Sequence, residues 1–136
     1  MRLSQLEAVF VKFDRRVETR KRVREGAGDN WTESDVYDFT GPVDYQTDVA
    51  TLAEADGIRF LCPKCYQVNG GNAGTHPVVC WFEGKVPDDA APRPGRWKPV
   101  GTGIEDLTFV PGAKSNSVLL LGGCAWHGFV TNGDAT

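Results

Sequence analysis

Two short stretches, far apart in the sequence, carry side chains that could bind a metal ion. The first is residues 61–65 (LCPKC), and the second is residues 123–128 (GCAWHG). Each stretch spaces two potential ligands three positions apart, and its proline or glycines permit a sharp bend that turns both side chains to one side. Three thiolates and one imidazole suit a tetrahedral Zn²⁺ ion, and protein groups would fill every position, as in structural sites. The predicted zinc ligands are Cys62, Cys65, Cys124 and His127.

Three other interpretations of the cysteines are less favoured: ordinary buried thiols, a redox pair and a disulfide framework. A redox pair at Cys62 and Cys65 needs a βαβ context with the motif at the start of a helix. The glycines at positions 70, 71 and 74 disfavour a helix there. A disulfide framework would suit four cysteines, but the sequence opens without a signal-peptide pattern, so we expect a reducing cytoplasm in which cysteines more often bind metal.

His76 and Cys80 form a second pair that could do chemistry, as a base and its nucleophile. Residues 77–82 (PVVCWF) predict a buried strand, in which positions four apart are separated by about 13 Å, too far for a hydrogen bond. Cys80 is therefore interpreted as a packed core thiol. His76 could replace one zinc ligand or support one by a hydrogen bond, and whether either residue joins the metal site stays open.

The amino-acid composition limits the possible fold classes. The 136 residues, 40% hydrophobic and 24% charged, are typical of one soluble globular domain, and no apolar run approaches the roughly 20 residues of a membrane span. Sixteen glycines and eight prolines predict many turns and short strands. We predict a mainly β (small α+β) domain of antiparallel strands stapled by a zinc-ribbon-like Cys3His site. Its one short helix is expected near residues 48–56, where Thr51 and Glu54 form a capping pattern.

Charge changes sign along the chain near residue 25. Residues 15–24 are rich in Arg and Lys, whereas residues 25–56 contain neither and accumulate carboxylates. We expect the acidic stretch to pack against the basic one as an ordered irregular loop, so 1–136 is one domain with a charged insertion or loop region at 15–46. A net charge of −3 also argues against general nucleic-acid binding.

The proline-rich residues 87–99, with Arg93, Arg96 and Trp97, predict an extended surface segment that could contact a partner.

Several segments together resemble a group of uncharacterised small proteins encoded by tailed bacteriophages and related bacterial loci. The segments are FLCPKC, GTHPVVCW, PGRW, GTGIEDLTF and SVLLLGGCAWHGFVTNG. The resemblance covers roughly residues 47–136, and Glu18 to Gln46 looks like an insertion relative to that group. It implies a metal site at Cys62, Cys65, Cys124 and His127 and a phage context, but no activity.

The leading functional hypothesis is therefore a phage-encoded, non-catalytic zinc protein that acts as a virion accessory or decoration, or as an adaptor that binds a protein. It would work in the host cytoplasm or in the virion, with a protein partner and no membrane. One alternative is a zinc-ribbon-like nucleic-acid module that uses residues 15–24 and 93–98. The other is a metal-dependent hydrolase, which needs an open coordination position for water and a base such as Glu105 or Asp106.

Overall fold

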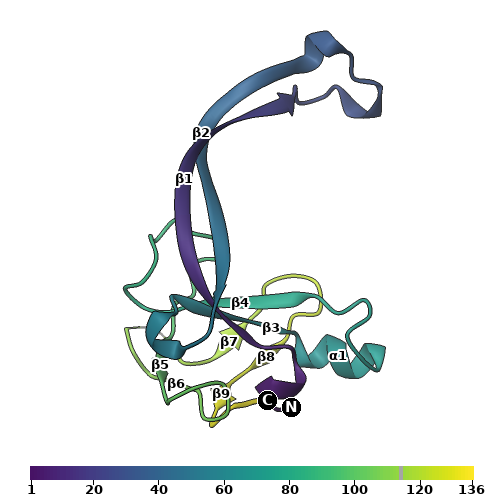
Figure 1. Cartoon of the computed structure of the whole chain (residues 1–136). Coiled ribbons are helices and arrows are strands. Elements are labelled where there is room, and N and C mark those ends of the chain that lie inside the picture. The colour runs from purple at the N-terminus through teal and green to yellow at the C-terminus, as the bar shows by residue number, and fades with distance from the viewer. Residues whose placement is uncertain (114) are drawn as a thin grey trace. The chain divides into compact units, whose positions relative to one another are not determined.

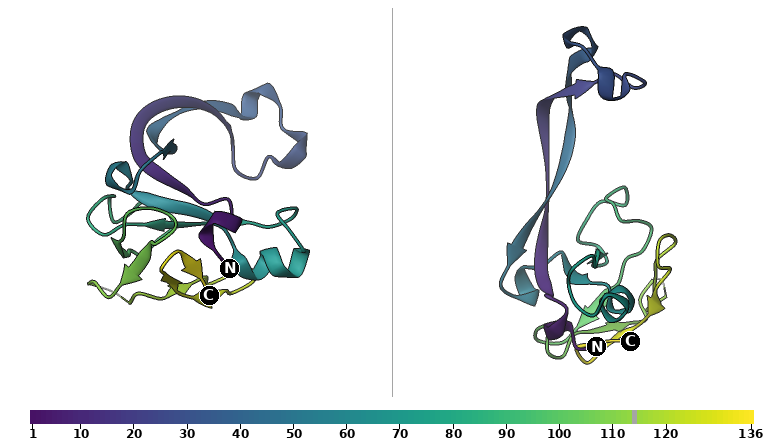
Figure 2. Two further views of the ribbon diagram at one scale, coloured as in Figure 1. Left: turned by 60° about the horizontal axis from the view of Figure 1, so that its bottom comes forward. Right: turned by 90° about the vertical axis from the view of Figure 1, so that its right-hand side faces the viewer.

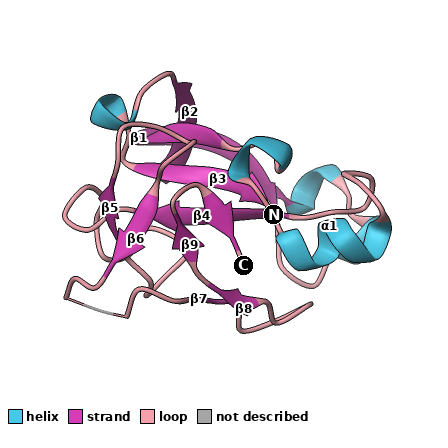
Figure 3. Cartoon of the chain, turned by 90° about the horizontal axis from the view of Figure 1, so that it is seen from below, coloured by secondary structure: helices cyan, strands magenta, loops and turns pink. Residues whose placement is uncertain are grey.

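The computed structural model describes residues 1–113 and 115–136. Within them the chain is mainly β, built from antiparallel sheets with a single α-helix, which confirms the predicted fold class (Figure 3). The chain divides into two compact units: Met1–Phe13 with Thr47–Thr136, and Asp14–Gln46. The second unit contains the charged region at residues 15–46.

The elements follow one another in short succession. The strands are β1 (Val9–Val23), β2 (Val36–Val49), β3 (Gly57–Leu61), β4 (Pro77–Trp81), β5 (Lys98–Val100), β6 (Thr108–Val110), β7 (Val118–Leu119), β8 (His127–Gly128), β9 (Val130–Thr131) and β10 (Asp134–Ala135). The helix is α1 (Pro63–Asn69), and the 3-10 turns are η1 (Leu3–Gln5), η2 (Gly28–Asn30), η3 (Glu33–Asp35) and η4 (Leu52–Glu54). Apolar, β-branched runs at residues 8–13, 58–61, 77–82 and 107–110 each predict a strand. Strands are present at all four places, with ends within one residue of the prediction except that β1 continues to Val23.

The main sheet has the order β2-β1-β3-β4, with β3 paired antiparallel to both β1 and β4. Three two-stranded ribbons, β5–β6, β7–β8 and β9–β10, accompany it. The β9–β10 ribbon turns at Asn132 and Gly133, both with positive φ, as the Asn-Gly pair predicts. The chain ends lie side by side in every view, because Met1 O accepts a hydrogen bond from Ala135 N (Figures 1 and 2).

The core of the larger unit lies between the main sheet and these ribbons. Phe60 of β3 meets Trp126 edge-to-face at 6.1 Å, and Trp97 stacks on Phe109 of β6 at 5.7 Å. Leu3, the first residue of η1, and Leu6, which follows η1, are fully buried in the same cluster. Aromatic burial of this kind is the main source of stability in a small β domain that has only one short helix.

The helix lies at a different place from the one predicted. Residues 48–56 form only the 3-10 turn η4, capped by Thr51, whose hydroxyl accepts a hydrogen bond from Glu54 N. The α-helix instead follows β3 directly, over Pro63–Asn69, and ends at Gly70 in the left-handed conformation. The glycines therefore terminate this helix instead of preventing it. In the part of the chain that the structure describes, no helix is long and apolar enough to cross a membrane.

The smaller unit, Asp14–Gln46, is a two-stranded hairpin formed by most of β1 and β2 and the turns between them (Figure 1). The expectation of an irregular loop was wrong here, because residues 36–45 largely alternate between exposed and half-buried side chains, as a strand does. On one face, Arg22 stacks over Phe39 at 3.8 Å and Arg24 over Tyr37 at 5.3 Å. Elsewhere along the hairpin, carboxylates of β2 pair with cations of β1, so the two charged stretches neutralise each other as predicted. The cross-strand pairs are Arg15–Asp44 and Lys21–Asp38.

The proline-rich segment is not extended. It folds around Arg96, whose side chain is only 8% exposed although the sequence suggests a surface contact. Its guanidinium donates hydrogen bonds to the carbonyl oxygens of Pro87, Ala90 and Pro92, among others. A buried cation needs such partners, so the loop closes over it.

Truncation of a buried leucine tests this core. Leu107→Ala removes a side chain with no exposed surface, and we expect a loss of about 2–5 kcal/mol in the free energy of unfolding. The control Leu121→Ala alters a side chain that is 86% exposed and is expected to change stability by less than about 0.5 kcal/mol. Equilibrium urea unfolding followed by tryptophan fluorescence measures both. Equal losses in the two variants would contradict the assigned core.

Candidate metal centre

Four side chains with soft or borderline donor atoms converge in the larger unit. They are Cys62, Cys65, His76 and Cys124, whose donor atoms all lie within 4.8 Å of one another. They come from three separate segments: the junction of β3 and α1, the residue before β4, and the turn between β7 and β8. The group can hold a metal ion, and its donors are three sulfurs and one imidazole nitrogen, the set that the sequence predicts.

The start of α1 positions two of the thiols. Cys62 is the residue before the first helical residue, and Pro63 occupies the first position, where its missing N–H costs nothing. Tyr66 N donates to Cys62 O at 2.9 Å and closes the first turn. Residues three apart lie on the same face of a helix, so Cys65 comes to lie beside Cys62. Cys62 is fully buried and Cys65 partly so.

The pairing of β3 with β4 positions the histidine. The register places Leu61 opposite Pro77, and one step further Cys62 N donates to His76 O at 3.0 Å. The Nδ1 atom of His76 lies 3.1 Å from Pro77 O, so the tautomer with a proton on Nδ1 donates to this carbonyl. Its Nε2 then carries the lone pair and points to the thiols, 3.4 Å from Cys124 Sγ. A histidine that binds a metal usually has its other nitrogen held in this way.

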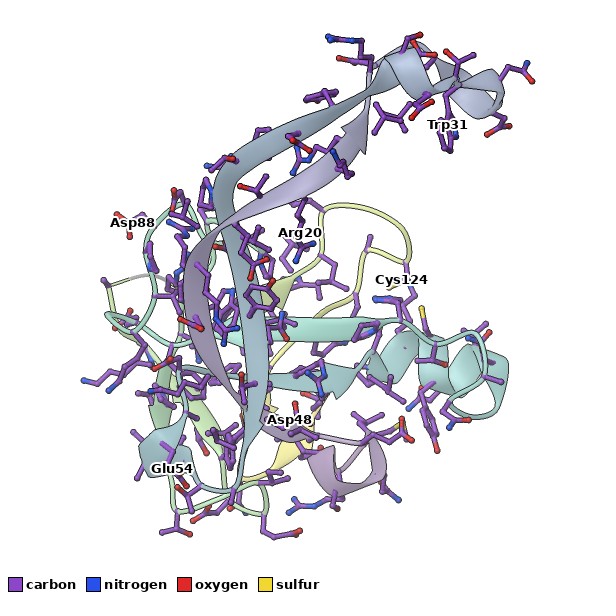
Figure 4. All side chains as sticks on the ribbon, turned by 45° about the horizontal axis from the view of Figure 1, so that its top comes forward. Arg20, Trp31, Asp48, Glu54, Asp88 and Cys124 are labelled. Atoms are coloured by element: carbon purple, nitrogen blue, oxygen red, sulfur yellow. The ribbon has the colours of Figure 1, made fainter. Side chains whose placement is uncertain are left out.

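A tight turn presents Cys124. Ala125 N donates to Gly122 O and Leu120 N to Trp126 O, which closes the turn between β7 and β8. Gly123 and Ala125 have φ values of +57° and +52°, which glycine tolerates and alanine adopts only under constraint. Lys64 Nζ donates to Cys124 O at 2.7 Å and ties the turn to α1. Figure 4 shows the Cys124 sulfur beside this helix.

The distances fit a tetrahedral ion. With metal–sulfur bonds of about 2.3 Å, two sulfurs on a tetrahedral ion are about 3.8 Å apart, and a sulfur and a nitrogen slightly less. The Sγ atoms of Cys62 and Cys124 are 3.6 Å apart, and Nε2 of His76 is 3.4 Å from Cys124 Sγ. These two distances are those of ligands on one ion, and all four donor atoms lie within 4.8 Å of one another.

The electrostatics of the group favour a bound cation. The hydrogen bond between Nε2 of His76 and the sulfur of Cys124 lowers the pKa of Cys124 to about 6 and raises the pKa of His76. Burial raises the pKa of Cys65 to about 11 and also raises that of Cys62. Three thiolates this close repel one another, so a positive ion is what allows all three to be deprotonated together.

His127, the histidine favoured by the sequence, lies outside this group, and His76 takes its place. The turn at Cys124 closes at Trp126, where the chain enters β8. Alternation along the strand then buries Trp126 against Phe60 and leaves His127 exposed, with its ring 6.2 Å from that of Phe129. The signal that could have found His76 is the hairpin register, which places it opposite Cys62.

The remaining candidate residues serve other purposes. Cys80 lies in β4, fully buried, and burial raises its pKa far above the ordinary range, as expected of a core thiol. Asp106 accepts hydrogen bonds from Thr102 N and Gly103 N, which lower its pKa and hold a turn. Glu105 forms an ion pair with Arg2 at 3.8 Å. Neither carboxylate belongs to the metal group, so neither is placed to act as a base on a metal-bound water.

Comparisons with known proteins give no match: no family model matches the chain, and neither does any curated protein or solved structure. The resemblance to small tailed-bacteriophage proteins stays a prediction. The geometry of the four donors is therefore the basis for a functional assignment.

A pair of histidine variants tests which ring binds the metal. We expect His76→Ala to remove one of four ligands, so that Co²⁺, used as a spectroscopic probe, loses its tetrahedral d–d absorption or binds far more weakly. The matched change His127→Ala alters an exposed ring and is expected to leave the spectrum and the stoichiometry unchanged. Titration of reduced, metal-free protein with Co²⁺ measures both. The opposite pattern would restore His127 as the ligand.

Proposed function

We propose that this protein is a non-catalytic binding module whose fold is held by a structural zinc ion. The observation that carries the proposal is the convergence of Cys62, Cys65, His76 and Cys124, because four protein ligands leave no coordination position for a substrate or a reactive water. Zinc is the best fit among common metals, since a tetrahedral set of three thiolates and one imidazole is characteristic of it.

The zinc would add one more connection between three parts of the chain. It joins the end of β3, the start of β4 and the turn between β7 and β8, which lie up to 62 residues apart in sequence. The two-residue strands β7 and β8 are too short to fix this turn alone. Because metal binding and folding are linked, a cross-link of this kind adds its binding free energy to the stability of the folded state.

The exposed surface beside the zinc turn supports a role in binding protein. Leu119 of β7 pairs with His127 of β8, and Phe129 is the residue directly after β8. Leu119 and Phe129 are 53% and 43% exposed, and Leu121 is more exposed still. Large apolar side chains gathered on one ribbon are typical of a contact surface for another protein.

The nucleic-acid alternative receives less support. Within the hairpin Asp14–Gln46, Arg15, Arg16, Arg20 and Lys21 each pair with a carboxylate of the same hairpin. Cations that are already neutralised release fewer counterions from a phosphate backbone, so they contribute less affinity. An adaptor or accessory role in a bacteriophage particle stays a prediction from the motif resemblance.

Metal analysis of the purified protein tests the structural zinc. Native mass spectrometry is expected to show one zinc per chain, and its removal by a chelator to lower the unfolding temperature by at least about 10 °C, since several kcal/mol of stability are lost. Cys65→Ser should abolish zinc binding, whereas Cys80→Ala, which alters a cysteine outside the group, should retain it.

Two results would contradict this function. A protein that keeps its unfolding temperature after complete metal removal would not depend on a structural ion. A Co²⁺ derivative with five-coordinate absorption and an exchangeable water would show an open position, and would favour a metal-dependent hydrolase.

A further inference from the structure

A groove of about 510 Å³ in the larger unit is not used by the metal centre, although His76 lies at its margin. One side is the outer edge of β4, with Val79, and the other is formed by Val118 and Leu120 around β7. The proline-rich loop closes it with Pro92, Pro94 and Trp97. Most of these side chains are apolar, as in grooves that accept peptide side chains.

The edge of β4 that faces this groove has unused backbone groups. The hydrogen bonds from Cys62 N to His76 O and from Phe82 N to Asp56 O identify the hydrogen-bonded pairs of the β3–β4 ladder. In an antiparallel ladder these pairs alternate with pairs whose N–H and C=O groups point away from the partner strand. Val79 belongs to the second kind, so both of its backbone groups point away from β3.

Nothing else in the described part of the chain pairs with this edge at Val79. β4 is the last strand of its sheet. Two residues further on, Trp81 O faces the same way and accepts a hydrogen bond from Trp97 N at 3.1 Å. On the other side, Pro77 has no N–H, and its carbonyl lies 3.1 Å from Nδ1 of His76. Val79 therefore offers one free donor and one free acceptor, with which one residue of a partner backbone can form a hydrogen-bonded pair at this edge.

The charge of the groove indicates what kind of segment can bind in it. Its positively charged lining residues are Arg93 and Arg96, and none of the described residues that line it carries a carboxylate. Arg93 is exposed at the margin and forms no ion pair with a described carboxylate. Arg96 is buried, and its Nε has no hydrogen-bond partner. A segment with a carboxylate would complement these cations.

We infer that the groove binds an extended segment of a partner protein, which adds as a strand to the edge of β4 at Val79. The segment places apolar side chains between the proline-rich loop and β7 and an Asp or Glu beside Arg93. This inference rests on the proposed role as a binding module and names the class of partner, an extended apolar and acidic peptide.

Peptide selection tests the inference on the full, zinc-loaded chain. A displayed library of random twelve-residue peptides is selected against the protein, and enriched peptides are resynthesised with a fluorophore. We expect a consensus with alternating apolar residues and at least one Asp or Glu, and affinities on the order of 1–100 μM. In the ¹⁵N spectrum, the Val79 amide should shift and become protected from hydrogen exchange on binding.

Variants of the groove separate backbone pairing from other contacts. Val79→Pro removes the free N–H on an edge strand, where proline is tolerated, and should abolish binding. The control Val79→Thr keeps both the N–H and the shape and should bind as the unaltered chain does. Arg93→Glu should weaken binding at least about tenfold, a loss of about 1.4 kcal/mol, whereas Lys98→Glu makes the same charge change outside the groove and should not.

The outcomes distinguish this inference from the structural zinc. Zinc content and unfolding temperature are measured for every variant, so a variant that fails to fold is recognised. Peptides that bind Val79→Pro as well as the unaltered chain, or no enrichment on a zinc-loaded, folded protein, would overturn the inference and leave the zinc assignment standing. A dimer in light scattering that Val79→Pro dissociates would assign the groove to a second copy of this chain and would also overturn it. Peptide binding by a protein without zinc would support the groove and contradict the zinc.

Discussion

The antiparallel pairing of β3 with β4 is the constraint on which the rest of the larger unit depends. Its register puts Cys62 opposite His76, so two donors from segments on either side of α1 meet at the end of one ladder. The same ladder brings Ile58, Phe60 and Cys80 into the core, where each is fully or almost fully buried. A shift of one residue would turn every side chain of β4 to the opposite face and separate the metal group.

The metal group and the core support each other through the turn between β7 and β8. Trp126 packs against Phe60 from the core side, and Cys124 meets the other donors two residues earlier. The positive φ angles of Gly123 and Ala125 cost conformational free energy, and interactions between neighbouring residues do not compensate for this cost. Packing of Trp126 and coordination of Cys124 offset that cost, which explains how so short a ribbon can keep a definite position.

The hairpin Asp14–Gln46 follows a different principle. It contains no residue that is fully buried, and its order comes from cross-strand ion pairs and from arginines stacked on aromatic rings. Exposed ion pairs each contribute little, so a ribbon held by them depends on many small interactions along its length. The charge pattern of the sequence therefore described the composition of this hairpin correctly. Its strands were not predicted, because aromatic residues scattered among carboxylates give only a weak alternating pattern of apolar and polar residues.

Local sequence determined what depends on neighbours a few positions apart. The CPxC spacing, the Asn-Gly turn and the apolar runs at β3, β4 and β6 specify their geometry through backbone sterics, and each was predictable. The three cysteines of the metal group could also be named, because thiols at such spacing, next to proline or glycine, are typical of metal ligands. The choice between His76 and His127 could not be made in this way. It depends on the register of β3 with β4 across α1 and on the packing of Trp126 against Phe60, and both are contacts between segments that are not neighbours in the sequence.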